Sequence, residues 1–158
     1  MKIGLMSLAL CLALAGSAIA AEKVDPISPG ARDKCPVCGM FVAKYPDWTG
    51  MIVFRNNARV YFDGPKDLFS YVLDPAKYDP ARKRSDIAAL SVKDYYSLAA
   101  IDGKRAFYVI GSNVLGPMGK ELIPFARKAD AEGFLKDHQG KAILRFDEVT
   151  PATLKDLR

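Results

Sequence analysis

The order of apolar segments repeats along this chain, and the repetition constrains the fold more than any other feature. Each repeat has two short β-prone segments, then an apolar stripe at helical spacing, then another β-prone segment. The repeats cover about residues 51–101 and 106–149. Short connections between β segments favour antiparallel pairing. The sequence therefore predicts an α+β fold of two successive ββαβ units with mainly antiparallel small sheets.

The first unit has clear boundaries. Residues 51–54 and 60–62 are predicted strands, and the asparagines between them tolerate the backbone angles of a hairpin turn. Asp63-Gly64-Pro65 provides residues that commonly begin a helix, and Pro75 ends the apolar stripe that follows. We expect Asp63 and Asp67 to cap the start of this helix.

The later segments follow the same order. They are predicted to be one or two strands in 87–101, strands at 106–111 and 121–126 around a Gly/Pro loop at 113–119, a helix at 130–138, a strand at 141–149 and a helical tail at 150–158.

The first 20 residues have the layout of a secretory signal peptide. Lys2 is their only charge, an apolar stretch follows, and Ala18 and Ala20 form an A-x-A site, so we expect cleavage after Ala20. The alternative is an uncleaved membrane anchor. Cys11 lies in the middle of the apolar stretch behind Leu10, so the sequence has no lipobox. We expect a soluble periplasmic protein, although association with a membrane stays open.

Removing the signal peptide changes the charge and the cysteine count. The chain has 158 residues, a formal charge of +5 and three cysteines, and loss of Lys2 and Cys11 leaves 138 residues, +4 and two cysteines. Residues 21–34 carry two prolines and no apolar periodicity, so they are predicted to form a flexible leader. A net charge of +4 is too small to indicate nucleic-acid binding. The one basic cluster, at 82–84, also lies close to acidic residues.

The motif Cys35-Pro36-Val37-Cys38-Gly39-Met40 opens the folded part, from residue 35 to 149. Two thiols and a thioether are soft donors, which favour an ion such as Cu(I) over hard cations. Gly39 lets the chain turn tightly enough for Cys38 and Met40 to face one ion.

Three other interpretations of the motif remain. A closed zinc site needs four ligands, and the chain has no second Cys pair and only one histidine, His138, so such a site is hard to build within one chain; two chains sharing one ion is the remaining option. A thiol-disulfide oxidoreductase could use Cys35 and Cys38, but few residues precede the motif to provide the usual strand. The pair could also be a structural disulfide, as is common in an oxidising compartment.

Several motifs together resemble the NosL family, accessory copper proteins of nitrous-oxide reductase. They are the CPVCGM motif, Tyr61-Phe62-Asp63, Asp67-Leu68-Phe69, and Gly116-Pro117-Met118-Gly119. The resemblance covers about residues 33–149 and implies a fold of two ββαβ units. It also implies a periplasmic copper chaperone, not an enzyme, that binds Cu(I) and delivers it to nitrous-oxide reductase or a similar cuproenzyme in denitrification.

The resemblance also implies a set of ligands. The family's Cys-Gly-Met falls on Cys38, Gly39 and Met40, and its loop methionine falls on Met118. Cys35 is an additional thiol, which can assist in binding or pair with Cys38. We therefore predict a metal site of Cys35, Cys38, Met40 and Met118, and expect His138 to lie at a helix end.

Two features depart from related families. Many NosL proteins are lipoproteins, whereas this chain has no lipobox. Residues 35–78 also resemble the YHS metal-binding domain, but Asp63 and Asp67 stand where that domain has a second Cys pair. As hard donors they suit Cu(I) poorly.

Overall fold

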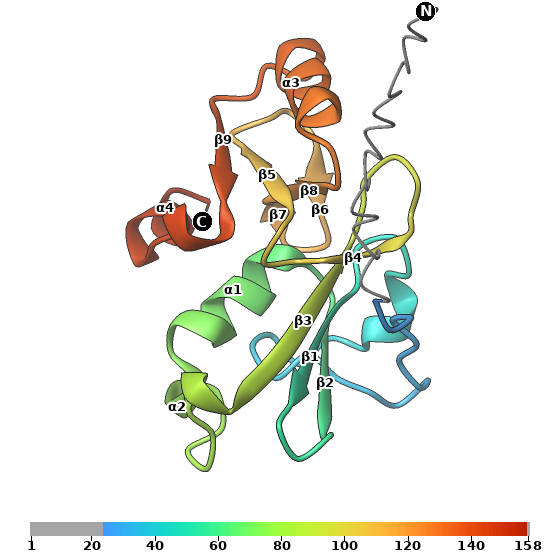
Figure 1. Cartoon of the computed structure of the whole chain (residues 1–158), viewed down its shortest axis with the longest axis vertical. Helices are drawn as coiled ribbons and strands as arrows, with labels where there is room; N and C mark the ends of the chain where they lie inside the picture. Colours follow the sequence, from blue (N-terminus) through green and yellow to red (C-terminus); the bar gives the residue numbers. More distant parts are fainter. Residues whose placement is uncertain (1–23, 158) are drawn as a thin grey trace, which may run out of the picture.

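The computed structural model describes residues 24–157, so the predicted signal peptide lies outside the described residues. Within 24–157, no helix combines the length and the apolar character needed to cross a bilayer. The predicted fold class is confirmed: the chain forms small antiparallel sheets with helices packed on them (Figure 1).

The first sheet has four strands in the order β2-β1-β3-β4, all antiparallel. They are β1 (Gly50–Phe54), β2 (Arg59–Phe62), β3 (Ile87–Lys93) and β4 (Ala100–Asp102). Asn57 adopts a positive φ of 62° in the β1–β2 turn, a conformation that asparagine tolerates better than most residues. The predicted hairpin is therefore confirmed, and the segment at 87–101 forms two strands.

Helix α1 (Pro65–Leu73) follows β2 and packs against β1 and β2. Pro65 is the first helical residue, where its missing N–H costs nothing. The short helix α2 (Pro75–Tyr78) follows directly, because Pro75 cannot continue α1 but can begin a new helix. Short 3-10 helices at Val42–Lys44 and Arg84–Asp86 complete this half.

The second sheet has three strands in the order β8-β5-β9. They are β5 (Phe107–Ile110), β8 (Ile123–Phe125) and β9 (Ala142–Arg145), with α3 (Lys128–Asp137) between β8 and β9. The predicted loop at 113–119 contains a small hairpin of β6 (Leu115–Gly116) and β7 (Gly119–Lys120), in which Gly119 has a φ of 85°. A 3-10 helix at Phe146–Glu148 and helix α4 (Pro151–Asp156) end the described chain.

One core joins the two halves. The ring of Phe69 on α1 lies 4.9 Å from that of Tyr108 on β5 and 5.4 Å from that of Phe146. Helix α4 also contacts α1. A second, smaller cluster packs α3 on the second sheet through Phe125 and Phe134, whose rings are 5.1 Å apart. Helix α1 is therefore the central element on which both halves pack.

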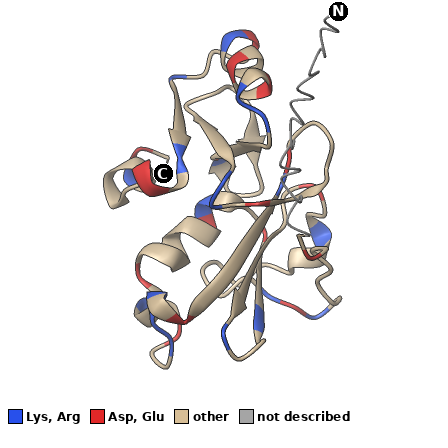
Figure 2. Cartoon of the chain, viewed as in Figure 1, with Lys and Arg blue, Asp and Glu red and all other residues tan. Residues whose placement is uncertain are grey.

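Charged residues of both signs are interspersed over the loops and helices (Figure 2). Lys and Arg do not gather on one face in this view.

Candidate metal centre

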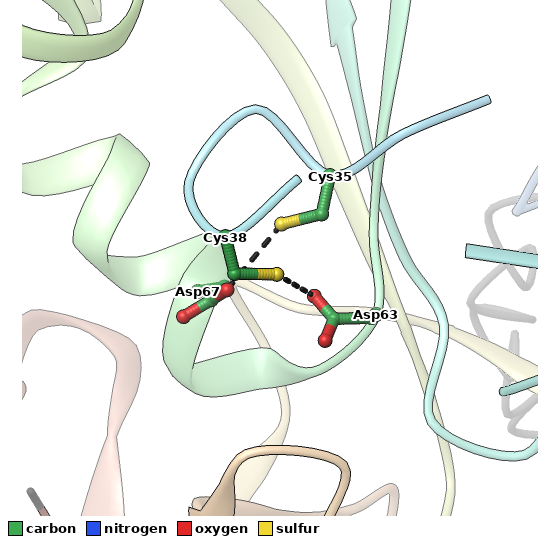
Figure 3. Close-up of side chains that lie close together, drawn as sticks. All are labelled: Cys35, Cys38, Asp63 and Asp67. Atoms are coloured by element: carbon green, nitrogen blue, oxygen red, sulfur yellow. Dashed lines mark hydrogen bonds between the residues drawn. The ribbon is translucent and has the colours of Figure 1, made fainter. Parts of the chain in front are cut away.

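The loop that carries the two cysteines is closed by its own backbone. The Cys35 N–H donates to the Met40 carbonyl at 2.9 Å, and the Gly39 N–H donates to the Cys35 carbonyl at 2.8 Å. Gly39 has a φ of 80°, which L side chains rarely adopt. The loop lies against the start of α1 (Figure 3), where both thiols face the same two carboxylates.

Those carboxylates belong to Asp63 and Asp67. The Cys35 thiol donates to Asp67 Oδ2 at 3.4 Å, and the Cys38 thiol donates to Asp63 Oδ1 at 3.2 Å (Figure 3). One donor atom from each of the four residues lies within 4.8 Å of the others. We call this group the thiol-carboxylate cluster. Its size is that of a site for a small metal ion.

The expectation that Asp63 and Asp67 cap the helix is wrong. The N-cap of α1 is Gly64, and neither Asp63 nor Asp67 makes a capping hydrogen bond to the described part of this helix. The two carboxylates accept from thiols because the cysteine loop covers this end of the helix. Asp63 and Asp67 thus add two donors to the two thiols, so one chain does provide four donor atoms, contrary to the prediction that such a site is hard to build within a single chain.

The cluster is largely shielded from water. Cys35, Asp63 and Asp67 are 2%, 0% and 7% exposed, whereas Cys38 is partly exposed. Asp63 Oδ2 is buried and has no hydrogen-bond partner within the described part of the chain, which is costly for a carboxylate oxygen and suits an incoming cation. Any ligand exchange would begin at Cys38, because its sulfur is the more accessible of the two.

Burial controls the protonation of the cluster. It raises the pKa of Cys38 to about 12; the hydrogen bond from the Met40 backbone opposes this rise, and the neighbouring Asp67 and Asp63 carboxylates add to it. Burial also raises the pKa of Cys35 and that of Asp67. Both thiols therefore keep their protons near neutral pH, and a metal ion that binds them as thiolates must displace those protons.

These properties argue against the thiol-disulfide oxidoreductase. Such an enzyme needs an accessible cysteine with a depressed pKa. Here Cys35 is buried, and the pKa of each thiol is raised. Both cysteines are free thiols in the structure, not a structural disulfide.

The donor set suits a metal ion of soft or intermediate character. Two thiolates fit Cu(I), and two thiolates with two carboxylates also provide the four ligands of a tetrahedral zinc site. The geometry alone thus indicates a metal site but does not distinguish Cu(I) from zinc.

The predicted methionines lie at different places around this cluster. Met40 closes the cysteine loop through its carbonyl, and its side chain is partly buried. Met118 lies in the β6–β7 turn and is 46% exposed. Among residues 24–157, no hydrogen bond joins either thioether to the cluster, and their roles as ligands stay predictions.

His138 follows α3 as its C-cap, the helix end predicted for it. Its ring stacks on Phe134 at 4.3 Å, and its Nδ1 lies 3.2 Å from Asn113 Oδ1. These contacts explain its position without a metal.

A sequence signal for Asp63 and Asp67 did exist. They follow Tyr61-Phe62 at the positions where the YHS domain has its second Cys pair, four residues apart on one face of a helix start. That placement indicates side chains directed at the first Cys pair, whatever their chemical type.

A small α+β protein with a shielded cluster of two thiols and two carboxylates belongs to the class of metal-binding proteins. The NosL family model matches residues 26–154, and the chain therefore belongs to the NosL family. The predicted family is confirmed. It is a family of copper chaperones and not of enzymes, so the predicted non-enzymatic class is confirmed as well.

Two relatives illustrate the similarity. The copper-binding lipoprotein NosL of Stutzerimonas stutzeri is 27% identical over 137 residues, which cover 85% of this chain and 71% of the relative. The crystal structure of the copper chaperone NosL from Shewanella denitrificans has a TM-score of 0.68 and 29% identity, covering 81% of this chain and 97% of that chain.

Proposed function

We propose that this protein is a periplasmic chaperone that binds one Cu(I) through Cys35 and Cys38 and delivers it to nitrous-oxide reductase or a similar cuproenzyme. The observation that carries the proposal is the convergence of two thiols on one shielded position, at the end of the helix on which both halves of the molecule pack. The relatives named as copper proteins support copper as the cargo.

The chemistry of loading follows from the cluster. Cu(I) forms a bond with each sulfur as each thiol loses a proton, so no electron is transferred and two protons are released. Asp63 and Asp67 already accept the thiol hydrogen bonds, and they can pass these protons to solvent. Met40 and Met118 would add thioether ligands, which are soft, neutral and exchangeable.

Release follows from the unequal burial of the thiols. A thiolate or imidazole of the recipient can approach the partly exposed Cys38 first, while Cys35 still holds the ion. Stepwise exchange of this kind moves the ion without exposing it to water. A soluble periplasmic location is proposed because the sequence has a signal peptide without a lipobox, unlike the lipoprotein relative.

Competition for Cu(I) tests the binding. The reduced mature protein is titrated against a colorimetric Cu(I) chelator, together with Cys35→Ser and Cys38→Ser. We expect one equivalent of Cu(I) in the parent and a loss of about 100-fold or more in affinity in each variant, because a thiolate is replaced by a hydroxyl. Asp130→Asn, at the start of α3, is the control. Failure of the parent to retain Cu(I), or unchanged binding by Cys38→Ser, would refute the proposal.

Transfer tests the recipient. The copper-loaded protein is mixed with apo nitrous-oxide reductase in the presence of a chelator that captures free Cu(I). We expect copper on the reductase after separation of the proteins. Copper found only on the chelator would exclude direct delivery to that enzyme.

A further inference from the structure

Two buried ionisable side chains, Lys66 and Glu121, join the start of α1 to the β6–β7 hairpin. They are 8% and 3% exposed and lie 55 residues apart in the sequence. Neither belongs to the thiol-carboxylate cluster, but Lys66 directly precedes Asp67. Buried charged groups are rare unless they are fully hydrogen-bonded, so their contacts need an explanation.

Lys66 holds the hairpin through its ammonium group. Nζ donates to the Met118 carbonyl at 2.6 Å and to the Lys120 carbonyl at 2.9 Å, and a third contact reaches the Leu157 carbonyl at 3.5 Å. Two of these acceptors flank the Gly119 turn. The ammonium therefore fixes the backbone of Met118 relative to the first turn of α1.

Glu121 makes the reciprocal connection. Its Oε1 accepts from the backbone N–H of Lys66 at 2.5 Å and from that of Leu122 at 2.9 Å. The first of these N–H groups belongs to the start of α1, where the helix itself provides no acceptor. Glu121 thus takes the capping role at α1 that Asp63 and Asp67 do not take.

Glycines leave the space for this arrangement. A Cβ at Gly64 would collide with Glu121 Oε2 and would stand 3.9 Å from Pro117 Cδ. A Cβ at Gly116 would stand 3.1 Å from Glu121 Cγ. The Gly116–Gly119 turn therefore lies close to the residue between Asp63 and Pro65, and a side chain at that residue would displace the Glu121 carboxyl group.

We propose that Lys66 and Glu121 are positioning residues, which hold the Met118 turn beside the thiol-carboxylate cluster so that the Met118 thioether can join the ion. This inference rests on the proposed function. Met118 is 46% exposed, and an unanchored turn would have to be ordered each time the ion bound. The hydrogen bonds of Lys66 and Glu121 order the turn in advance.

A double-mutant cycle in Cu(I) affinity tests the proposal. The parent, Lys66→Met, Met118→Ala and the double variant are compared by chelator competition. We expect Lys66→Met and Met118→Ala each to weaken binding about tenfold, the usual scale for residues that orient a ligand. The double variant should be no weaker than Met118→Ala alone, because Lys66 acts only through Met118. Leu115→Ala, exposed on the same hairpin, is the control and should bind as the parent does.

Other results overturn the proposal. If Lys66→Met weakens binding by the same factor with and without Met118, its effect is on the fold and not on the thioether. If Met118→Ala binds Cu(I) as tightly as the parent, Met118 is not a ligand, and the positioning role proposed for Lys66 and Glu121 is wrong. The Cys38→Ser test of the proposed function is independent of both results, so the two failures are distinguishable.

Two variants of Glu121 test the same proposal while leaving the Lys66 ammonium group unchanged. Burial raises the pKa of Glu121 to about 8, so an uncharged glutamine can accept the same two N–H bonds. Glu121→Gln should keep the parent affinity, and Glu121→Ala should lose about as much as Lys66→Met. Equal affinity of both variants would contradict the proposal. X-ray absorption at the copper edge should show one sulfur fewer in Lys66→Met and Glu121→Ala than in the parent.

Discussion

The starts of α1 and α3 occupy the same place in the two ββαβ units but have different surroundings. Each helix follows a strand and leads to a third strand. At α1, Asp63 and Asp67 are buried and accept hydrogen bonds from two thiols. At α3, Asp130 forms a surface ion pair with Arg127 at 2.5 Å. The repeated fold therefore does not make a site by itself.

The difference comes from what covers each helix start. The cysteine loop and the β6–β7 hairpin both pack on the first turn of α1, through Cys35 and Lys66. The start of α3 has an arginine in solvent instead, with 77% of its side chain exposed. At α1, burial raises the pKa of Asp67 above its ordinary value.

The largest expected effect is the pH dependence of copper binding. Because both thiols are protonated near neutral pH, two bound thiolates release two protons, and the apparent Cu(I) affinity should rise about 100-fold per pH unit between pH 6 and 8. Chelator competition at several pH values measures the slope. A tenfold rise per unit would show that only one thiolate binds.

A comparison of two glycines tests the cysteine loop. A Cβ at Gly39 or at Gly133 of α3 would meet nothing within 4 Å, but only Gly39 has a positive φ. Gly39→Ala should therefore lower the free energy of unfolding by about 1–2 kcal/mol, whereas Gly133→Ala should raise it by about 0.4–1 kcal/mol. Urea denaturation measures both. A stable Gly39→Ala variant would show that the loop does not need this conformation.

Asp67→Asn tests the electrostatics of the cluster. The Asp67 carboxylate helps to raise the pKa of Cys38, so its neutralisation should lower that pKa and speed alkylation of Cys38 severalfold at pH 8. Asp130→Asn should leave the rate unchanged. Equal rates for Asp67→Asn and the parent would mean that burial alone sets the reactivity of the thiol.

The smallest effect is expected at the start of α3. Arg127→Ala removes an exposed ion pair, which contributes little because solvent screens it. Its urea midpoint should equal that of the parent, and copper affinity should not change. A clear loss of stability would show that the second unit depends on this pair more than its exposure suggests.

Local sequence signals were sufficient for most of the fold. Pro65 and Pro75 mark the start of α1 and the start of α2, and the asparagine turn marks the first hairpin. The strand predicted at 141–149 is shorter, because Glu148 accepts from the Arg145 N–H at 2.6 Å and turns the chain into a 3-10 helix. That interaction was not visible in the apolar pattern.

The site was only half predictable. Cys35 and Cys38 are three residues apart, so a short stretch of sequence is enough to predict a metal site there. Their contacts to Asp67 and Asp63 span 32 and 25 residues, and these carboxylates look like ordinary helix-capping residues in the sequence. Their place after Tyr61-Phe62 is the one sequence signal for them, and the packing of the cysteine loop on α1 shows which thiol each carboxylate contacts.

X-ray absorption at the copper edge of the reduced, loaded protein tests the central claim most directly. We predict Cu(I) bound by at least two sulfur atoms, with one sulfur lost in Cys35→Ser and one lost in Cys38→Ser. Copper bound only by nitrogen or oxygen, or a spectrum that neither substitution changes, would contradict the assignment of the ion to this cluster.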